Sequence, residues 1–264
     1  MSGAPLLKRV DELGRATLTL NRPELRNAFD DELIVLLVEA LKELERSSTV
    51  RVVMLAASGT AFSAGADLAW MRRMADYTFD ENLADAAALA ALMATLAGLK
   101  KPTIALVQGP AVAGGLGLVA CCDIALATEA ATFGLPEVRL GLTPAVISPY
   151  VVAAIGARAT RRYALTAEAF DAREALRIGL VHELLPDAEA LTARADSLTR
   201  AILQGGPNAI RATKELLEVV AHTPLDDDLV AWTARRTAET RASEEARGGL
   251  AAFFDKAEAP WLED

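Results

Sequence analysis

The stretch PTIALVQGPAVAGGLGLVACCDIALATEAATFGLPE, residues 102–137, decides the fold. Thr103 to Val107 is a short run of β-branched and aliphatic residues that Gly109-Pro110 interrupts, which predicts a buried strand ending in a turn. Glycines at 114, 115 and 117 then open an apolar helix that runs towards Cys122, and they let another group approach the backbone closely. The first amides of a helix have no partner within it and lie at the positive end of its dipole. The stretch therefore predicts a site for a phosphate, or for an oxyanion that exists only during a reaction.

The same order of strand, glycine turn and helix occurs earlier in the chain. Val50 to Ala57 predicts a buried strand, SGTAFSAGAD at 58–67 a turn, and Leu68 to Ala75 a helix or a mobile segment. This recurrence predicts an α/β fold of stacked ββα units. The other elements expected before residue 186 are strands at 6–13, 15–20, 123–133 and 180–185, a helix capped by Asp30 or Asp31, a helix at 81–99 started by Asp80, and helices at 148–165 and 172–178.

The last quarter of the chain is expected to be helical. From Pro186 onward the strand signals disappear, and residues 187–203, 207–222 and 225–256 carry helical patterns. We therefore predict a core of ββα units over residues 1–200 and a helical region over residues 201–264. The amphipathic run from Leu229 to Phe254 indicates that the helical region packs against other subunits.

Composition narrows the possible functions. The 264 residues are 52% hydrophobic, which is ample for a core, and the net charge of -9 makes nucleic acid an unfavourable partner. The only cysteines, Cys121 and Cys122, are adjacent in an apolar run, which suits neither a disulfide framework nor a metal site. The first residues carry charges throughout and lack the apolar segment of a secretory signal. These features predict a globular protein of a reducing, cytoplasmic compartment.

One segment resembles a membrane span in its hydropathy. Residues 102–122 contain no charged residue and follow Lys100-Lys101. The prolines and glycines of this segment, together with Gln108, favour a strand, a turn and a helix in a protein core. No association with a membrane is expected.

Other catalytic motifs fit less well. Gly115 to Ala120 matches GxGxxA, with Glu137 about 20 residues further on, but the segment before the next strand at Asp123 is too short for the crossover helix of a dinucleotide-binding unit. Ser63 is not within GxSxG, and no motif links it to either histidine. Walker, HExxH and CxxC motifs are absent from the sequence, so neither a metal nor a separate cofactor is expected.

Two glycine turns are the better candidates for chemistry. Ala64-Gly65-Ala66-Asp67 and Ala113-Gly114-Gly115 each follow a predicted buried strand, and each can direct one backbone N–H towards a common point. Two such donors form an oxyanion hole, in which each well-placed donor is worth about 3 to 4 kcal/mol in the transition state. The alternative is that both are ordinary tight turns.

The motifs taken together resemble the enoyl-CoA hydratase/isomerase family, the crotonases. FSAGADLAWM at 62–71, QGPAVAGGLGLVACCD at 108–123 and FGLPEVRLGLTP at 133–144 carry this resemblance, supported by NRPELRNAF at 21–29 and by the C-terminal pair Phe253 and Lys256. The resemblance covers nearly the whole chain. It implies a crotonase-like spiral of ββα units, an acyl-CoA thioester substrate that brings its own coenzyme A, and homotrimers that often pair into hexamers.

The resemblance also implies particular site residues. The amides of Ala66 and Gly114 are expected to bind the thioester oxygen, and Glu137 is expected to be the acid–base group. Phe253 and Lys256 are expected to reach the nucleotide of the same or a neighbouring subunit. The residues expected to contact substrate or CoA are Arg22, Leu25, Arg26, Asn27, Ser63, Ala64, Gly65, Asp67, Leu68, Trp70, Gly115, Gly117, Pro136, Phe253 and Lys256.

One position departs from the pattern of the family's hydratases. They resemble this chain around Glu137 but carry a further glutamate three residues after the oxyanion glycine, where this chain has Gly117. Glu137 lies between apolar neighbours, which should raise its pKa towards the range useful for acid–base chemistry. With one carboxylate the chain is expected to be a hydratase, an enoyl-CoA isomerase, or a CoA-binding homologue without activity. The motifs most resemble hydratases of branched or carboxylated substrates such as 3-methylglutaconyl-CoA and carboxygeranoyl-CoA, so hydration is preferred.

Overall fold

The computed structural model describes residues 3–262. These residues form two compact units: the first comprises the chain up to residue 99 together with residues 103–196, and the second comprises residues 100–102 and the chain from residue 197. The boundary between the two units lies inside α7 (Ala188–Leu203). The boundary predicted from the sequence, after residue 200, falls in the same helix.

A six-stranded sheet forms the centre of the first unit. Its order is β1-β2-β3-β4-β6-β9, in which β1 and β2 are antiparallel and every later pair is parallel. The strands are β1 (Leu6–Val10), β2 (Arg15–Leu20), β3 (Val52–Ala57), β4 (Thr103–Val107), β6 (Ile124–Thr128) and β9 (Glu183–Leu185). The parallel strands β3 and β4 are largely or wholly buried, in agreement with their continuous apolar sequences.

A second, smaller layer of β structure holds the glycine turns. It consists of β5 (Ala111–Val112), β7 (Thr132–Gly134) and β8 (Phe170–Asp171) in the order β5-β7-β8. Single parallel bridges extend it, one joining Ser63 to Ala111 and the other joining Phe29 to Ala66. The two layers agree with the α/β fold of repeated strand, turn and helix units that the recurring sequence pattern predicts.

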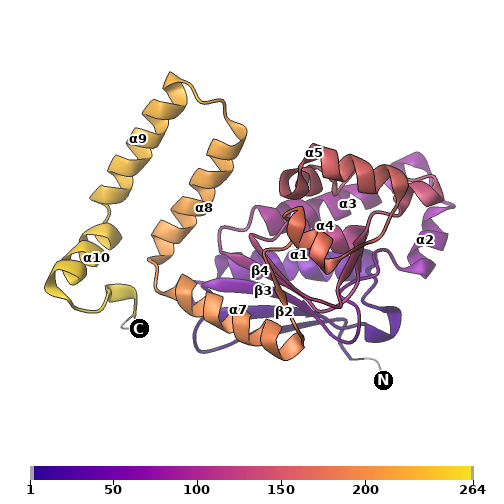
Figure 1. The fold of residues 1–264 in the computed structure, drawn as a ribbon, viewed down its shortest axis with the longest axis horizontal. Coiled ribbons are helices and arrows are strands. Elements are labelled where there is room, and N and C mark those ends of the chain that lie inside the picture. Colours follow the sequence, from indigo (N-terminus) through magenta and orange to yellow (C-terminus); the bar gives the residue numbers. More distant parts are fainter. Residues whose placement is uncertain (1–2, 263–264) are drawn as a thin grey trace. The chain divides into compact units, whose positions relative to one another are not determined.

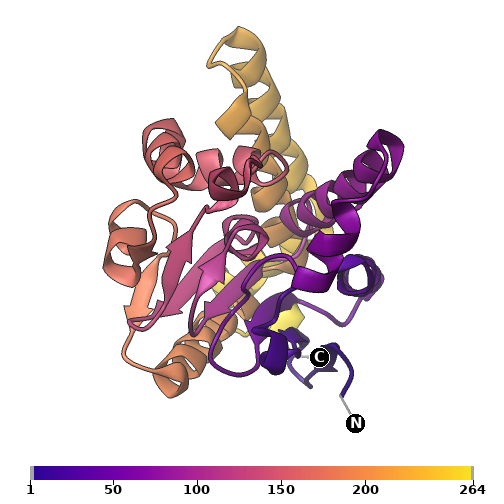
Figure 2. The same ribbon diagram turned by 90° about the vertical axis from the view of Figure 1, so that its right-hand side faces the viewer.

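Helices of the first unit cover one side of the larger sheet. Figures 1 and 2 show α1 (Asp31–Arg46) and α3 (Phe79–Ala97) on the same side of the strands, where they contact each other. Leu37 of α1 and Leu92 of α3 meet Leu18 and Leu55 of the sheet in the core. The other helices are α2 (Leu68–Met74), α4 (Gly114–Ala120), α5 (Ser148–Thr166) and α6 (Ala172–Arg177), with short 3-10 turns η1 (Pro23–Leu25) and η2 (Glu137–Leu140).

The second unit is helical over its described residues. It contains the end of α7, then α8 (Pro207–His222), α9 (Asp227–Ala242), α10 (Glu244–Asp255) and the 3-10 turn η3 (Pro260–Leu262). None of the helices described in either unit is long and apolar enough to cross a membrane.

Several predicted boundaries were wrong. The helix predicted to begin after Asp80 begins at Phe79, because Thr78 and Glu81 form a reciprocal capping box. The single helical run predicted over 225–256 is two helices, because Ser243 ends α9 with extended backbone and caps α10. The strand signals at 6–13, 123–133 and 180–185 correspond to shorter strands. Of the two proposed caps for α1, Asp30 is the one that accepts a hydrogen bond from the Leu33 amide.

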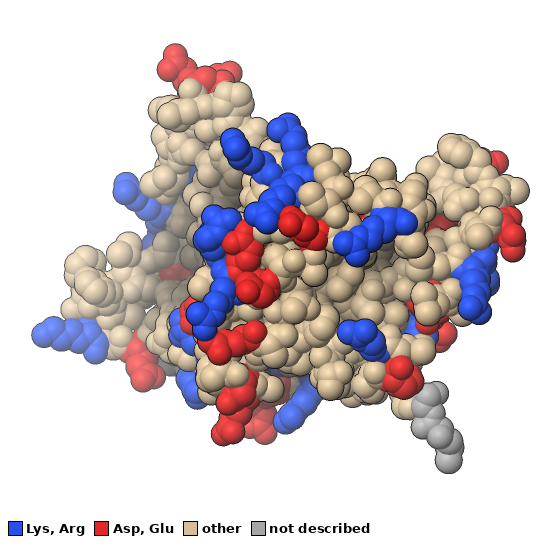
Figure 3. Space-filling view, turned by 45° about the vertical axis from the view of Figure 1, so that its right-hand side comes forward, with Lys and Arg blue, Asp and Glu red and all other residues tan. Residues whose placement is uncertain are grey.

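Charged side chains on the surface are mixed in sign. On the face drawn in Figure 3, lysine and arginine side chains alternate with aspartate and glutamate, and no continuous basic area covers that face. The residues described also contain no group of histidine, cysteine, aspartate and glutamate arranged to hold a metal ion.

Candidate active site

The first glycine turn leaves the Ala66 amide without an acceptor. In the parallel bridge between Phe29 and Ala66, the Phe29 N–H donates to the Gly65 carbonyl at 2.9 Å, and the Asp67 N–H donates to the Phe29 carbonyl at 3.0 Å. This pattern directs the Ala66 N–H away from Phe29. Within residues 3–262 the Ala66 amide donates no hydrogen bond. It is therefore a donor available to a ligand.

The second turn leaves the Gly114 amide free in the same way. Gly114 is the first residue of α4, so its N–H has no partner in the helix, and no acceptor for it lies elsewhere in the described chain. Ala113, which precedes it, has φ 51° and ψ -122°, a backbone conformation that non-glycine residues rarely adopt. The Ala113 N–H donates to the Gly134 carbonyl at 2.9 Å, which holds the turn against β7.

The two turns are in direct contact. A Cβ added to Gly65 would lie 3.1 Å from the Ala113 Cβ, and one added to Gly115 would lie 2.8 Å from the Ser63 Cβ. A Cβ on Gly114 would lie 2.3 Å from Cζ of Phe29, the residue whose backbone is bridged to Ala66. These glycines are required because neighbouring atoms occupy the space of a side chain. The close packing places the two free amides on adjoining turns, as an oxyanion hole requires.

Glu137 follows the strand that holds the second turn. Gly134, whose carbonyl binds Ala113, is only three residues before it, so the Cα of Glu137 lies within about 11 Å of the Gly134 Cα. Pro136 precedes the 3-10 turn that begins at Glu137, and Leu135 is buried. The Oε2 atom of Glu137 is buried and has no hydrogen-bond partner. Burial raises the pKa of this carboxyl above its ordinary value, as the apolar sequence around it predicted.

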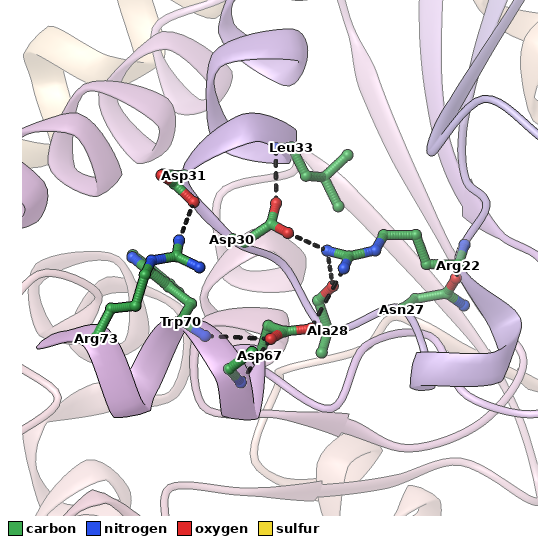
Figure 4. Close-up of polar contacts among 10 residues, drawn as sticks. Arg22, Asn27, Ala28, Asp30, Asp31, Leu33, Asp67, Trp70 and Arg73 are labelled. Carbon is green, nitrogen blue, oxygen red and sulfur yellow. Dashed lines mark hydrogen bonds and ion pairs between the residues drawn. The ribbon is translucent and has the colours of Figure 1, made fainter. Parts of the chain in front are cut away.

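The segment expected to line the CoA site is held by its own polar side chains. Arg22 donates to the Asp30 carboxylate at 2.7 Å and to the Ala28 carbonyl at 3.1 Å, and its other nitrogen lies 3.3 Å from the Asp67 carboxylate (Figure 4). Asn27 is fully buried: it accepts from the Arg22 amide and donates to the carbonyls of Ser58 and Ala61. The side chains of Arg22, Asn27 and Asp67 are thus occupied in fixing the segment against the first turn.

Other residues of this segment remain accessible. Leu25 and Arg26 are exposed, and the Arg26 carbonyl accepts from the Ala64 amide at 3.0 Å, which joins the segment to the first turn. The Ser63 hydroxyl is buried and accepts from the Gly65 amide. Contacts of these residues with CoA stay predictions, made through exposed side chains or backbone.

Helix α2 continues from the first turn. Asp67 caps it by accepting from the amides of Ala69 and Trp70. Trp70 is only 2% exposed, and its indole N–H donates to the Asp85 carboxylate at 3.0 Å, so its side chain belongs to the protein core. Leu68, by contrast, is 73% exposed. Of the two, Leu68 is the one available to a ligand.

Gly117 lies at the position where the hydratases of the family that this chain resembles carry their first glutamate. The structure has no room for a side chain at this position. A Cβ on Gly117 would lie 2.4 Å from Cγ2 of Ile147. Phe253 and Lys256 belong to the second unit: Phe253 is 75% exposed, and Lys256 ends α10 in the left-handed conformation.

Three residues of this site escaped prediction from the sequence. Ala113 carries the backbone conformation that directs the Gly114 amide, Phe29 joins the two turns, and Ile147 occupies the space beside Gly117. The glycines placed Ala113 in a turn, but nothing local in the sequence indicated its positive φ, or that Phe29 and Ile147 meet these glycines.

Comparison with known proteins agrees with the geometry. Residues 12–264 match the family described as enoyl-CoA hydratase/isomerase. The chain is 44% identical to an enoyl-CoA hydratase from Shewanella pealeana whose crystal structure superimposes with a TM-score of 0.94 over 98% of this chain and 96% of that one. It is 38% identical over 241 residues to a Thermus thermophilus protein with a provisional enoyl-CoA hydratase name, covering 91% of this chain and 94% of that protein. It is 32% identical to the 2,3-dehydroadipyl-CoA hydratase of Escherichia coli, covering 90% and 91%.

The chain therefore belongs to the enoyl-CoA hydratase/isomerase family, the crotonases, and is an enzyme of that family.

Proposed function

We propose that the protein is a hydratase that adds water across the α,β double bond of an enoyl-CoA thioester. The observation that supports this most directly is the presence of two free amides, on Ala66 and Gly114, on adjoining turns next to the segment of Glu137. The amides supply donors for a developing oxyanion, and the carboxyl supplies a proton carrier.

The proposed reaction follows from these groups. The thioester oxygen accepts from both amides, which stabilise the negative charge that reaches this oxygen when water attacks Cβ. Glu137 in its ionised form accepts a proton from the attacking water, and the enolate forms. Glu137 then donates that proton to Cα, and the thioester carbonyl is restored. The raised pKa of Glu137 suits both steps, since a group that takes and returns a proton works best with a pKa near the working pH.

The acyl group is proposed to be branched or carboxylated. The resemblance at 62–71 and 108–123 to hydratases of such substrates supports this, and 3-methylglutaconyl-CoA is the first candidate. The Escherichia coli relative is named for a substrate that also carries a free carboxylate. Coenzyme A enters as part of the substrate, and the proposal includes no separate cofactor or metal.

We also propose assembly into a homotrimer, or a hexamer of paired trimers, in the cytoplasm. Phe253 and Lys256 would then contact the CoA nucleotide in the same or a neighbouring subunit. The exposure of Phe253 and of other large apolar residues in the second unit supports a packed partner.

One assay with three substrates tests the activity. Incubation with 3-methylglutaconyl-CoA, crotonyl-CoA and a 3-enoyl-CoA distinguishes hydration from isomerisation and from no reaction. Hydration is expected, and Glu137→Gln should lower kcat by at least about 100-fold because it removes the proton carrier. Conversion of only the 3-enoyl-CoA would instead show an isomerase, and no turnover would favour a CoA-binding homologue. Full activity of Glu137→Gln would refute the role given to this residue.

A further inference from the structure

Ile147 occupies the space beside the proposed oxyanion hole in which a second acid–base group would otherwise stand. Gly117 lies three residues after Gly114 in α4, on the same face of that helix. Because Cβ atoms of a helix tilt towards its N-terminus, a side chain at 117 would lean towards the Gly114 end. A Cβ there would lie 2.4 Å from Cγ2 and 2.9 Å from Cβ of Ile147, and 3.4 Å from Cε of Met93. The first two distances are too short for any real side chain.

The position of Ile147 is fixed by its surroundings. The residue is 3% exposed and directly precedes α5, where its carbonyl accepts from the Val151 amide at 3.1 Å. Helix α5 contacts both α4, which carries Gly117, and η2, which begins at Glu137. Ile147 therefore cannot swing away from Gly117 without disturbing the packing of these elements.

The segments that carry Gly117 and Ile147 contain no carboxylate. Residues 114–122 and 141–156 carry only three ionisable side chains, those of Cys121, Cys122 and Tyr150. The Cys121 thiol is buried and Tyr150 is half-buried. Glu137, with one buried oxygen that has no partner, is the one acidic group that these segments bring to the turn of Gly114.

We propose that the side chain of Ile147 restricts the acyl site to one acid–base carboxylate. Its branched side chain fills the volume that a glutamate at 117 would need, and both proton transfers are thereby assigned to Glu137. This proposal rests on the proposed hydration through Glu137. The site then has a single carboxylate for two reasons: residue 117 has no side chain, and Ile147 occupies the space that such a side chain would need.

The test introduces a carboxylate at 117 in protein whose own carboxylate has been removed. Three variants are compared in a Glu137→Gln background: Gly117→Glu with Ile147→Gly, the matched uncharged pair Gly117→Gln with Ile147→Gly, and Gly117→Glu with Ile147 intact. Glycine at 147 is chosen because alanine would keep the Cβ that lies 2.9 Å from the new side chain. Values of kcat and KM are measured with the enoyl-CoA that the wild-type protein hydrates, and circular dichroism checks the fold.

Removal of the Ile147 side chain should allow the new glutamate at 117 to transfer protons in the hydration reaction. We expect kcat of the variant that combines Gly117→Glu with Ile147→Gly to exceed that of its glutamine match by at least tenfold, with KM changed less. The variant that keeps Ile147 should show no gain over Glu137→Gln alone. If the combination of Gly117→Glu with Ile147→Gly folds yet stays at the level of its match, the proposal is overturned. An equal gain with Ile147 present would overturn it as well.

A second measurement covers the case in which these combinations do not fold. Gly117→Ala, Ile147→Gly and the double variant form a thermal stability cycle, in which glycine at 147 again removes the Cβ that lies 2.9 Å from a Cβ at 117. We expect Gly117→Ala to lower Tm markedly in the presence of Ile147, and to lower it much less in the Ile147→Gly background. A neutral Gly117→Ala in the presence of Ile147 would show that the space is open and would refute the proposal. This cycle needs no activity, so it separates failure of the Ile147 assignment from failure of the proposed hydration.

Discussion

Ala113 combines an unfavourable backbone conformation with a position next to a proposed catalytic amide. Its φ of 51° and ψ of -122° are of the kind that costs about 1 to 3 kcal/mol for a residue with a side chain. The hydrogen bond from the Ala113 N–H to the Gly134 carbonyl holds Ala113 in this conformation, and its Cβ lies next to Gly65, where only glycine leaves room for it. Ala113 therefore acts on the oxyanion hole through Gly114, as a positioning residue.

Glycine at this position should separate stability from activity. Ala113→Gly removes the strain but makes the unfolded chain more flexible, so we expect Tm to stay equal or to rise. It should lower kcat several-fold with little change in KM, because the Gly114 amide is directed less firmly. The matched control is Ala120→Gly at the end of α4, which should lower stability by up to about 1 kcal/mol and leave kcat unchanged. An unchanged kcat in Ala113→Gly would contradict the positioning role.

Glu137 should weaken the fold at neutral pH. Burial raises its pKa in the folded protein above the unfolded value, so the folded state binds the proton more tightly. The stability that follows is complete below the unfolded pKa of about 4.3 and is lost as the pH rises through the folded pKa. We expect Glu137→Gln to melt at a higher temperature than the wild type at pH 7 to 8. The difference should vanish below about pH 4.

Glu183 provides a control, because its pKa is shifted in the direction opposite to that of Glu137. The Arg194 guanidinium lowers the pKa of Glu183, so its contribution to stability is present above the unfolded pKa and is lost as the pH falls through the folded one. Glu183→Gln should therefore melt at a lower temperature than the wild type at pH 7. Parallel melting curves from pH 4 to pH 8 compare the three proteins. A lower Tm of Glu137→Gln at pH 7 would contradict the stated cause of the shift.

At the scale of an element, the segment from Arg22 to Asp30 connects the larger sheet to the first glycine turn. Asn27 has a positive φ of 55°, which asparagine adopts more readily than most residues, and its amide donates to the half-buried Ser58 carbonyl and the buried Ala61 carbonyl. We expect Asn27→Ala to cost about 3 kcal/mol or more, because it leaves several buried polar groups without partners. Asn21→Ala, which loses only an exposed bond to the Ala4 carbonyl, should cost less than about 1 kcal/mol. Urea unfolding of both variants measures the difference, and equal losses would contradict this account.

The sequence was informative about elements where local signals agree. Asp30 before the apolar positions of α1, and the glycine runs after β3 and β4, specify their structures through caps and turns that involve few neighbours. The start of α3 was misplaced because Thr78 and Asp80 are both good caps, and only the reciprocal bond to Glu81 decides between them. The break of the last helical run at Ser243 is likewise a capping choice.

The parts of the site that could not be predicted depend on contacts between distant segments. Ser63 meets Gly115, and Phe29 meets Gly114, across separations in sequence that no local pattern encodes. Asn27 and Asp67 were expected to contact the ligand because they belong to the motifs at 21–29 and 62–71 that resemble the family. Their side chains are occupied within the protein, and this occupation follows only from the three-dimensional arrangement.

At the scale of the whole molecule, the second unit exposes several large apolar side chains. Its large exposed apolar residues are Leu217, Val219, Leu225, Val230, Leu250, Phe253 and Phe254. Single exposed apolar residues are normal, but several on one group of helices indicate a partner surface. A second or third copy of this chain is the partner that the family resemblance implies.

Light scattering tests this assembly directly. Three copies of the 27.9 kDa chain give a mass of about 84 kDa, and paired trimers give twice that value. Leu250→Ser with Phe254→Ser should shift the protein towards the monomer, because each change places a hydroxyl in an interface that is proposed to be apolar. Leu165→Ser, at an exposed leucine of the first unit, should leave the mass unchanged. If Phe253 and Lys256 contact the nucleotide in a neighbouring subunit, the monomeric variant should also show a raised KM. A wild-type protein that is monomeric at micromolar concentration yet fully active would contradict the role given to the second unit.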